Sequence, residues 1–176
     1  MNTPFAQNGT WVDAVKMSLP DHVADLEKNL DIVMTKHDLA DIEAHGVALA
    51  AAIASNNGGL AFEISMNSPL FGSSDRELAM KSVIAQQINS TYATYGRAAS
   101  RLEYETLPTK METNDLLPDE HIKYALYSMA AALVFRYEWI VWNYMEVLKD
   151  KGYTDEQLRD VTDIVSVVAA INKVVI

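Results

Sequence analysis

Apolar residues recur every three or four positions along most of the chain, and the residues that end helices fall between these stretches. This spacing is typical of amphipathic helices, and no segment shows the sustained alternation of a strand. Only 7 Gly and 5 Pro occur in 176 residues, which leaves room for long helices. The sequence therefore predicts an all-α fold. We expect a flexible N-terminal arm, residues 1–11, followed by a single helical domain, residues 12–176.

Helix-capping residues and apolar stripes divide this domain into about six helical segments, one of them short. Asp38 is predicted to cap the second segment, and Pro118 stands at the start of the fifth. Ser74–Glu77 and Thr154–Gln157 have the pattern of a capping box. The predicted segments span residues 18–34, 38–55, 60–66, 74–104, 118–151 and 154–176.

The two longest predicted helices, 74–104 and 118–151, resemble each other. Each begins at an acidic cap, continues through small and apolar residues, and then reaches a cluster of aromatic residues. This similarity indicates an internal repeat of two long helices. Two amphipathic helices also look alike without common ancestry, so the pattern alone leaves both explanations open.

The charge balance excludes two classes of partner. The formal net charge is −10 and the sequence pI is about 4.7, so the surface repels nucleic-acid phosphates and anionic lipids. The segment Met1–Met17 has one basic residue and no apolar core of a signal peptide, and the apolar run 46–54 is too short to span a membrane. We therefore expect a cytoplasmic protein that binds neither nucleic acid nor membrane.

The chain contains no cysteine, which excludes disulfides, thiolate-bound zinc, iron–sulfur clusters and a cysteine nucleophile. The four histidines, at positions 22, 37, 45 and 121, are scattered, and no two share a helical spacing that suits a metal ion. We therefore predict no metal site and no cofactor. His45 lies among alanines and is expected to be a hydrogen-bonded core residue rather than a ligand.

The order of the segments resembles the alkylhydroperoxidase D (AhpD) family, within the carboxymuconolactone decarboxylase-like superfamily. The resemblance covers residues 12–176, and each piece is short. The matching pieces are Leu19–Leu30, Val47–Ala54, the Ile88-Asn89 pair with Tyr92, Tyr104–Pro108 and Lys151–Asp160. The resemblance implies an AhpD-like helical domain and a homo-oligomer, commonly a trimer in this family.

The family's working motif is a Glu, then Cys-x-x-Cys, then a His, in which one thiolate attacks and the second cysteine resolves the disulfide. Carried over to this chain, the Glu falls on Ala125 and the two cysteines fall on Tyr137 and Ile140. A histidine between the cysteines falls on Trp139, and the one after them falls on Tyr144. None of these side chains can form a disulfide, so we predict that thiol-dependent peroxidase activity is absent and that no catalytic residue remains.

Tyr137, Ile140 and Tyr144 are spaced to share one helix face. One interpretation is that aromatic and aliphatic side chains fill the former cleft and form core. The other is a pocket for an apolar ligand, with the tyrosine hydroxyls as polar groups and Arg136 as an anion contact. Trp139 is equally expected to pack against a neighbouring subunit.

Two functional hypotheses follow. The first is a non-catalytic binding or scaffold protein that resembles the antioxidant alkyl hydroperoxide reductase component. The second is an enzyme of another reaction class, decarboxylase-like or otherwise converting a small molecule, that reuses the cleft around Tyr137 and Tyr144. The second hypothesis needs a positioned acid or base. The predicted cleft face offers tyrosines, so the first hypothesis is preferred.

Overall fold

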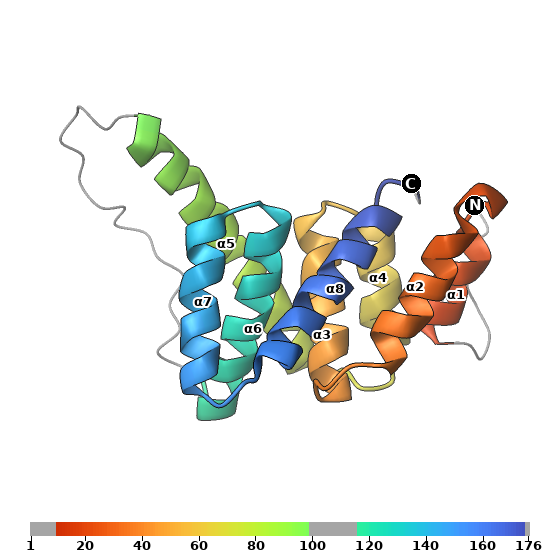
Figure 1. Cartoon of the computed structure of the whole chain (residues 1–176), viewed down its shortest axis with the longest axis horizontal. Coiled ribbons are helices and arrows are strands. Elements are labelled where there is room, and N and C mark those ends of the chain that lie inside the picture. Colours follow the sequence, from red (N-terminus) through yellow and green to blue (C-terminus); the bar gives the residue numbers. More distant parts are fainter. Residues whose placement is uncertain (1–9, 99–115, 175–176) are drawn as a thin grey trace.

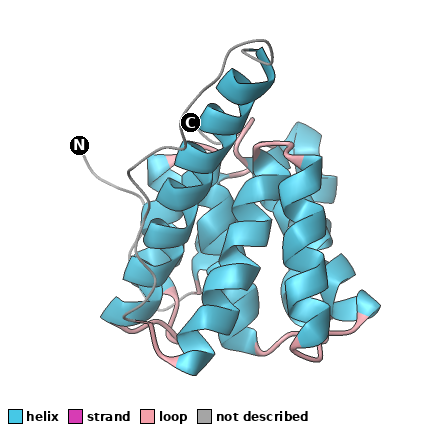
Figure 2. Cartoon of the chain, turned by 90° about the vertical axis from the view of Figure 1, so that its left-hand side faces the viewer, coloured by secondary structure: helices cyan, strands magenta, loops and turns pink. Residues whose placement is uncertain are grey.

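The computed structural model describes residues 10–98 and 116–174, and within these ranges every regular element is helical (Figure 2). The predicted all-α fold is therefore confirmed. The elements, labelled in Figure 1, are α1 (Trp11–Ser18), a short 3₁₀ helix η1 (Asp21–Val23), α2 (Ala24–Thr35), α3 (Asp41–Ala54), α4 (Gly58–Asn67), α5 (Ser73–Ala98), α6 (Pro118–Val134), α7 (Glu138–Asp150) and α8 (Asp155–Ile171).

Two differences raise the number of helices in the described residues above the predicted six. The helix α1 was not expected, and the predicted helix 118–151 is two helices, α6 and α7. Residues 1–9 of the predicted arm lie outside the described residues. Its last two residues, Thr10 and Trp11, are the N-cap and the first residue of α1, and Trp11 is fully buried.

The capping predictions were partly right. Thr154 and Gln157 form the expected capping box of α8, and Pro118 opens α6. The box predicted at Ser74–Glu77 was wrong, because α5 begins at Ser73 and Asp75 accepts a hydrogen bond from the backbone N–H of Gly72 (3.2 Å). The cap predicted at Asp38 was also wrong, because α3 begins at Asp41.

The start of α3 is instead closed by Glu43, whose carboxylate accepts a hydrogen bond from the backbone N–H of Ala40 (3.1 Å). Asp38 has a longer-range role: its N–H donates to the carboxylate of Asp160 on α8 (2.8 Å). A residue that looked like a local cap therefore connects the chain to its last helix.

The centre of the fold is the pair α3 and α6. The helix α3 packs against α4, α5, α6 and α8, and α6 packs against α3, α5, α7 and α8. Both helices carry runs of buried alanine, which allow close approach of the helix axes. The two helices are in close contact at Gly46, where an added Cβ would lie 2.1 Å from Cζ of Tyr127.

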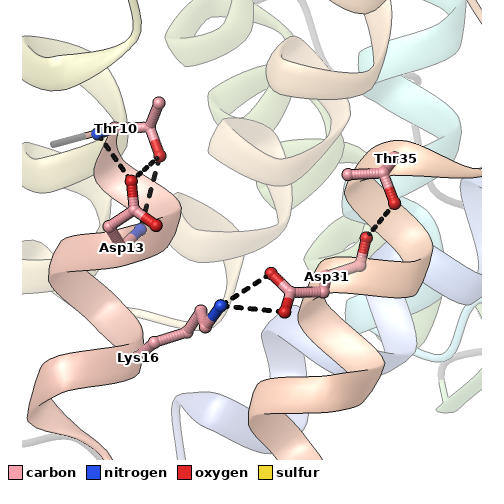
Figure 3. A network of polar contacts seen from close by, with 5 residues as sticks. All are labelled: Thr10, Asp13, Lys16, Asp31 and Thr35. Atoms are coloured by element: carbon pink, nitrogen blue, oxygen red, sulfur yellow. Dashed lines mark hydrogen bonds and ion pairs between the residues drawn. The ribbon is translucent and has the colours of Figure 1, made fainter.

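The helix α1 has a local cap at its start and an ion pair with α2 further along. Thr10 and Asp13 form a capping box at its start, with Thr10 N–H donating to Asp13 Oδ2 (3.1 Å). Further along, Lys16 Nζ donates to both carboxylate oxygens of Asp31 on α2, at 2.9 and 2.8 Å (Figure 3). The Asp31 carboxylate raises the pKa of Lys16, so this contact stays charged at neutral pH.

The helix α8 packs against α2, α3 and α6. Near its C-terminal end, Asn172 Nδ2 donates to the backbone oxygen of Ser55, at the end of α3 (2.9 Å). None of the helices in the described ranges is long and apolar enough to cross a membrane.

Candidate functional site

The positions onto which the resemblance carries the family's cysteine motif lie at the turn between α6 and α7. This turn is where the predicted single helix was wrong. Arg136 adopts a left-handed backbone conformation, with φ of 57°. The N–H of Arg136 donates to the oxygen of Leu133 (3.1 Å), and the N–H of Tyr137 donates to that of Ala132 (3.0 Å). These two bonds form a Schellman motif, which ends α6 and lets α7 start at Glu138.

The same turn occurs between α3 and α4. Asn56 has φ of 60°, its N–H donates to the oxygen of Ile53 (2.9 Å), and the N–H of Asn57 donates to that of Ala52 (3.2 Å). The repeated unit in the structure is therefore a helix, a Schellman turn and a second helix. It relates α3–α4 to α6–α7, whereas the sequence had paired 74–104 with 118–151.

Side chains at matching positions of the two units have matching environments. Leu60 and Ile140 are buried, and Phe62 and Trp142 are 60% and 61% exposed. The correspondence also pairs His45 with Ala125, the position onto which the family's Glu maps. Ala125 is buried in the main core and has no proton to transfer.

The structure brings Tyr137, Ile140 and Tyr144 together, as the sequence predicted. Tyr137 and Ile140 are 7% and 8% exposed and form a small apolar cluster with Ala132. Tyr144 and Val141, both half-buried, pack against this cluster. The side chains at the two positions that the resemblance assigns to cysteines therefore belong to one buried apolar cluster.

Tyr144 also contacts a polar side chain. The Tyr144 hydroxyl accepts a hydrogen bond from Gln86 Nε2 on α5 (2.7 Å). Gln86 Oε1 is buried and has no hydrogen-bond partner among the described residues. Burial raises the pKa of Tyr144, and it raises the pKa of Tyr124 to about 12. Both tyrosines therefore hold their protons at neutral pH and act as hydrogen-bonding groups rather than bases.

The structure does not bring Arg136 or Trp139 into this cluster. Both are exposed, Trp139 to 61%, and Trp142 is exposed to the same extent one turn further along α7. Arg136, Tyr137, Glu138 and Trp139 line a surface cavity of about 320 Å³ at the start of α7. Of the predicted pocket residues, only Tyr137 borders both the buried cluster and this cavity.

A second polar centre, at His45, was only partly anticipated. Nδ1 of His45 lies 2.7 Å from Ser68 Oγ and accepts a hydrogen bond from the indole N–H of Trp11 (3.3 Å). The rings of Trp11 and Phe71 meet the imidazole edge to face. The prediction of a hydrogen-bonded histidine is confirmed. The partner Trp11 was missed, although Thr10 and Asp13 had the spacing of a capping box that marks the start of its helix.

Because the indole N–H of Trp11 can only donate, Nδ1 of His45 must be unprotonated, so the ring is neutral with its proton on Nε2. Burial lowers the pKa of His45 below its ordinary value of 6.5. Ser68, itself 4% exposed, is enclosed beside it. This arrangement suits structural hydrogen bonding between α1, α3 and the end of α4. Among the described residues, no three acidic or histidine side chains gather to hold a metal ion.

The His45 arrangement predicts a pH-dependent stability. Since the pKa of His45 is lowered in the folded state, its contribution is complete above pH 6.5 and declines as the pH falls below 6.5 toward the folded-state pKa. Urea unfolding at pH 7.5 and pH 5.5 should show a lower free energy of unfolding at pH 5.5. The decrease should be smaller in His45→Gln, whereas equal decreases in both proteins would contradict the prediction.

The chain is similar in sequence to several known proteins. No family model matches the chain. Proteins named alkyl hydroperoxide reductase AhpD match it from Anaeromyxobacter dehalogenans (25% identity, 90% of this chain, 87% of the relative) and Streptomyces griseus (26%, 91% and 92%). Another, from Beijerinckia indica, is 29% identical over 58% of each chain.

These matches confirm the resemblance on which the motif positions depend. They extend through α6 and α7, since each of the first two covers about nine-tenths of the chain. The all-helical fold agrees with them, and the sequence has no cysteine at any position. The chain is thus similar to proteins named AhpD over about nine-tenths of its length, and it contains no cysteine.

Proposed function

We propose that this chain is a non-catalytic AhpD-like protein, which acts by binding rather than by thiol chemistry. The observation that carries the proposal is the packed cluster at the motif positions. A disulfide cycle needs two sulfur atoms that accept and return an electron pair. Tyr137 and Ile140, at those two positions, are instead part of one buried apolar cluster with Ala132. The relatives are named for the reduction of an alkyl hydroperoxide. This chain has no pair of thiols that could carry the electrons for that reaction.

The protonation states of the tyrosines argue against an acid–base enzyme at the same place. A general base must be able to lose its proton near the working pH. Burial keeps Tyr124 and Tyr144 protonated well above neutral pH, and Ala125 has no ionisable group. The site therefore supports a binding role more strongly than an enzyme of another reaction class.

The exposed tryptophans support an interaction surface on α7. Trp139 and Trp142 are each 61% exposed and one turn apart on the same helix. Large aromatic side chains are enriched at protein interfaces because they bury much apolar area at a low cost in conformational entropy. We therefore include self-association through α7, as a homotrimer by resemblance to the family, in the proposal.

A peroxidase assay tests the proposal. Purified, metal-free protein is mixed with an alkyl hydroperoxide and dihydrolipoamide, and peroxide consumption is followed against a heat-denatured control. We expect no consumption above that control, because the chain cannot form a disulfide. Light scattering on the same preparation reports the oligomeric state. Dithiol-dependent turnover would overturn the non-catalytic assignment, and a monomer at assay concentration would overturn the proposed trimer.

A further inference from the structure

A surface cavity of about 390 Å³ lies where the two repeated turns meet the last helix. The α3–α4 turn contributes Ser55, and the α6–α7 turn contributes Phe135 and Arg136. The last helix contributes one face that starts at Thr162, and the residues after its end contribute Lys173. Figure 1 shows both turns at the same end of the molecule as the C-terminal end of α8. Its volume is in the range of small-molecule sites.

The charge of this cavity is opposite to that of the chain. Its lining contains two cationic residues, Arg136 and Lys173, and no Asp or Glu, although the chain carries a formal charge of −10. Neither cation forms an ion pair with a residue of the described ranges, whereas Lys16, Lys123 and Lys149 do. The cavity is thus a local cationic site on an acidic protein.

Helix dipoles oppose this positive charge and explain part of why cations lie here. The C-terminal ends of α3, α6 and α8 each carry roughly half a negative charge, and nearby cations offset it. A helix-end role alone does not require an arginine in the left-handed conformation, which favours Gly or Asn. Asn occupies the matching turn of the other repeat, at position 56. Arg136 therefore supplies a long cationic side chain where a small residue would serve the backbone better.

The remaining lining provides an apolar wall and a hydroxyl. Leu133, Phe135 and Val165 line the cavity with apolar surface. Ser55 lines the cavity, and its Oγ is buried without a hydrogen-bond partner in the described part of the chain. Asn172 fixes the backbone of Ser55 through its hydrogen bond. A ligand with a polar head and a compact apolar body would satisfy both parts of this lining.

We propose that this cavity binds a small amphiphilic anion. Its carboxylate or phosphate head would lie between Arg136 and Lys173, and its apolar body would lie against Leu133, Phe135 and Val165. The site is separate from the packed cluster of Tyr137 and Ile140, and its existence does not depend on the loss of thiol chemistry.

Binding is tested by titrating the ¹⁵N-labelled full chain with octanoate, octyl phosphate, inorganic phosphate and 1-octanol, followed by two-dimensional NMR. We expect saturable shifts at Ser55, Phe135 and Ala169 with octanoate, octyl phosphate or both, and the tighter of the two identifies the head group. Inorganic phosphate and 1-octanol should each bind at least about tenfold more weakly. Inorganic phosphate lacks the apolar body, and 1-octanol lacks the anionic head group.

Three variants make the test specific. Arg136→Asn removes the charge while supplying the residue that the other turn uses, so the fold should be kept and binding should weaken about tenfold. Ala169→Phe should block the cavity without removing a cation. Lys28→Gln, on α2 and outside the cavity, should bind like the unmodified chain. Equal affinity for 1-octanol, or unchanged octanoate affinity in Arg136→Asn, would show that the cations only offset helix dipoles and would overturn the proposal.

Discussion

Replacing Gly46 with alanine is expected to lower the free energy of unfolding by on the order of 3 kcal/mol, a large effect for a single added methyl group. An ideal Cβ at this position would lie 2.1 Å from Cζ of Tyr127 and 2.2 Å from its Cε1 and hydroxyl. Side-chain carbons do not approach ring atoms so closely, and the Tyr127 ring is itself fully buried. The helices α3 and α6 must therefore separate, which disturbs the centre of the core.

Chemical denaturation followed by circular dichroism measures this effect. Gly58→Ala is the matched control, because it lies at the start of α4 and an added Cβ there meets nothing within 4 Å. Its free energy of unfolding should change by less than about 0.5 kcal/mol. In a Tyr127→Leu background, Gly46→Ala should cost much less than in the original chain. Similar costs for Gly46→Ala and Gly58→Ala would show that the two helices are not in close contact.

The sequence predicted the helical class and most helix positions because these depend on local signals. Apolar spacing and capping residues such as Thr154 lie within a few residues of the boundary they define. The break at Arg136 was missed because Phe135-Arg136-Tyr137 contains neither Gly nor Pro. The equivalent turn in the other repeat was recognised, since Asn56-Asn57 is followed by two glycines. Alignment of the α3–α4 and α6–α7 units would have revealed the break, but the sequence comparison had paired 74–104 with 118–151.

The candidate site, like the helices, was predicted where it depends on local spacing and missed where it depends on distant residues. Tyr137, Ile140 and Tyr144 were expected to share a face, and they do, since α7 starts directly after Tyr137 and keeps the helical spacing. The partner of Tyr144 was not predictable from local pattern, because Gln86 lies 58 residues away in the sequence. Arg136 was placed in the same pocket because a continuous helix had been assumed. The left-handed turn leaves its side chain exposed.

The geometry of this turn leads to a second large expected effect, a gain of disulfide chemistry. Tyr137 is the N-cap of α7 and Ile140 is its third residue, which is the position of a Cys-x-x-Cys motif at the start of a helix. In the double variant Tyr137→Cys with Ile140→Cys, a thiol at position 137 would face the N-terminal dipole of α7, and the guanidinium of Arg136 is adjacent in sequence. Both favour the thiolate, so its pKa should fall below the ordinary value of about 8.5. We expect the pair to close into a disulfide under mild oxidation.

The gain should appear as a mass loss of about two hydrogens on oxidation, reversed by dithiothreitol, and as thiolate absorbance that titrates below pH 8.5. Removing two packed side chains should cost roughly 2–4 kcal/mol each, so oxidation is measured at low temperature with the fold checked by circular dichroism.

Trp142→Cys with Met145→Cys has the same spacing in the interior of α7, where no free N–H groups face the thiol, and should oxidise less readily. Adding Tyr144→His places an imidazole one turn beyond the second sulfur. If the folded double variant resists oxidation as strongly as the interior pair, the motif does not map to this turn, and the loss of thiol chemistry would have to be argued from the absence of cysteine alone.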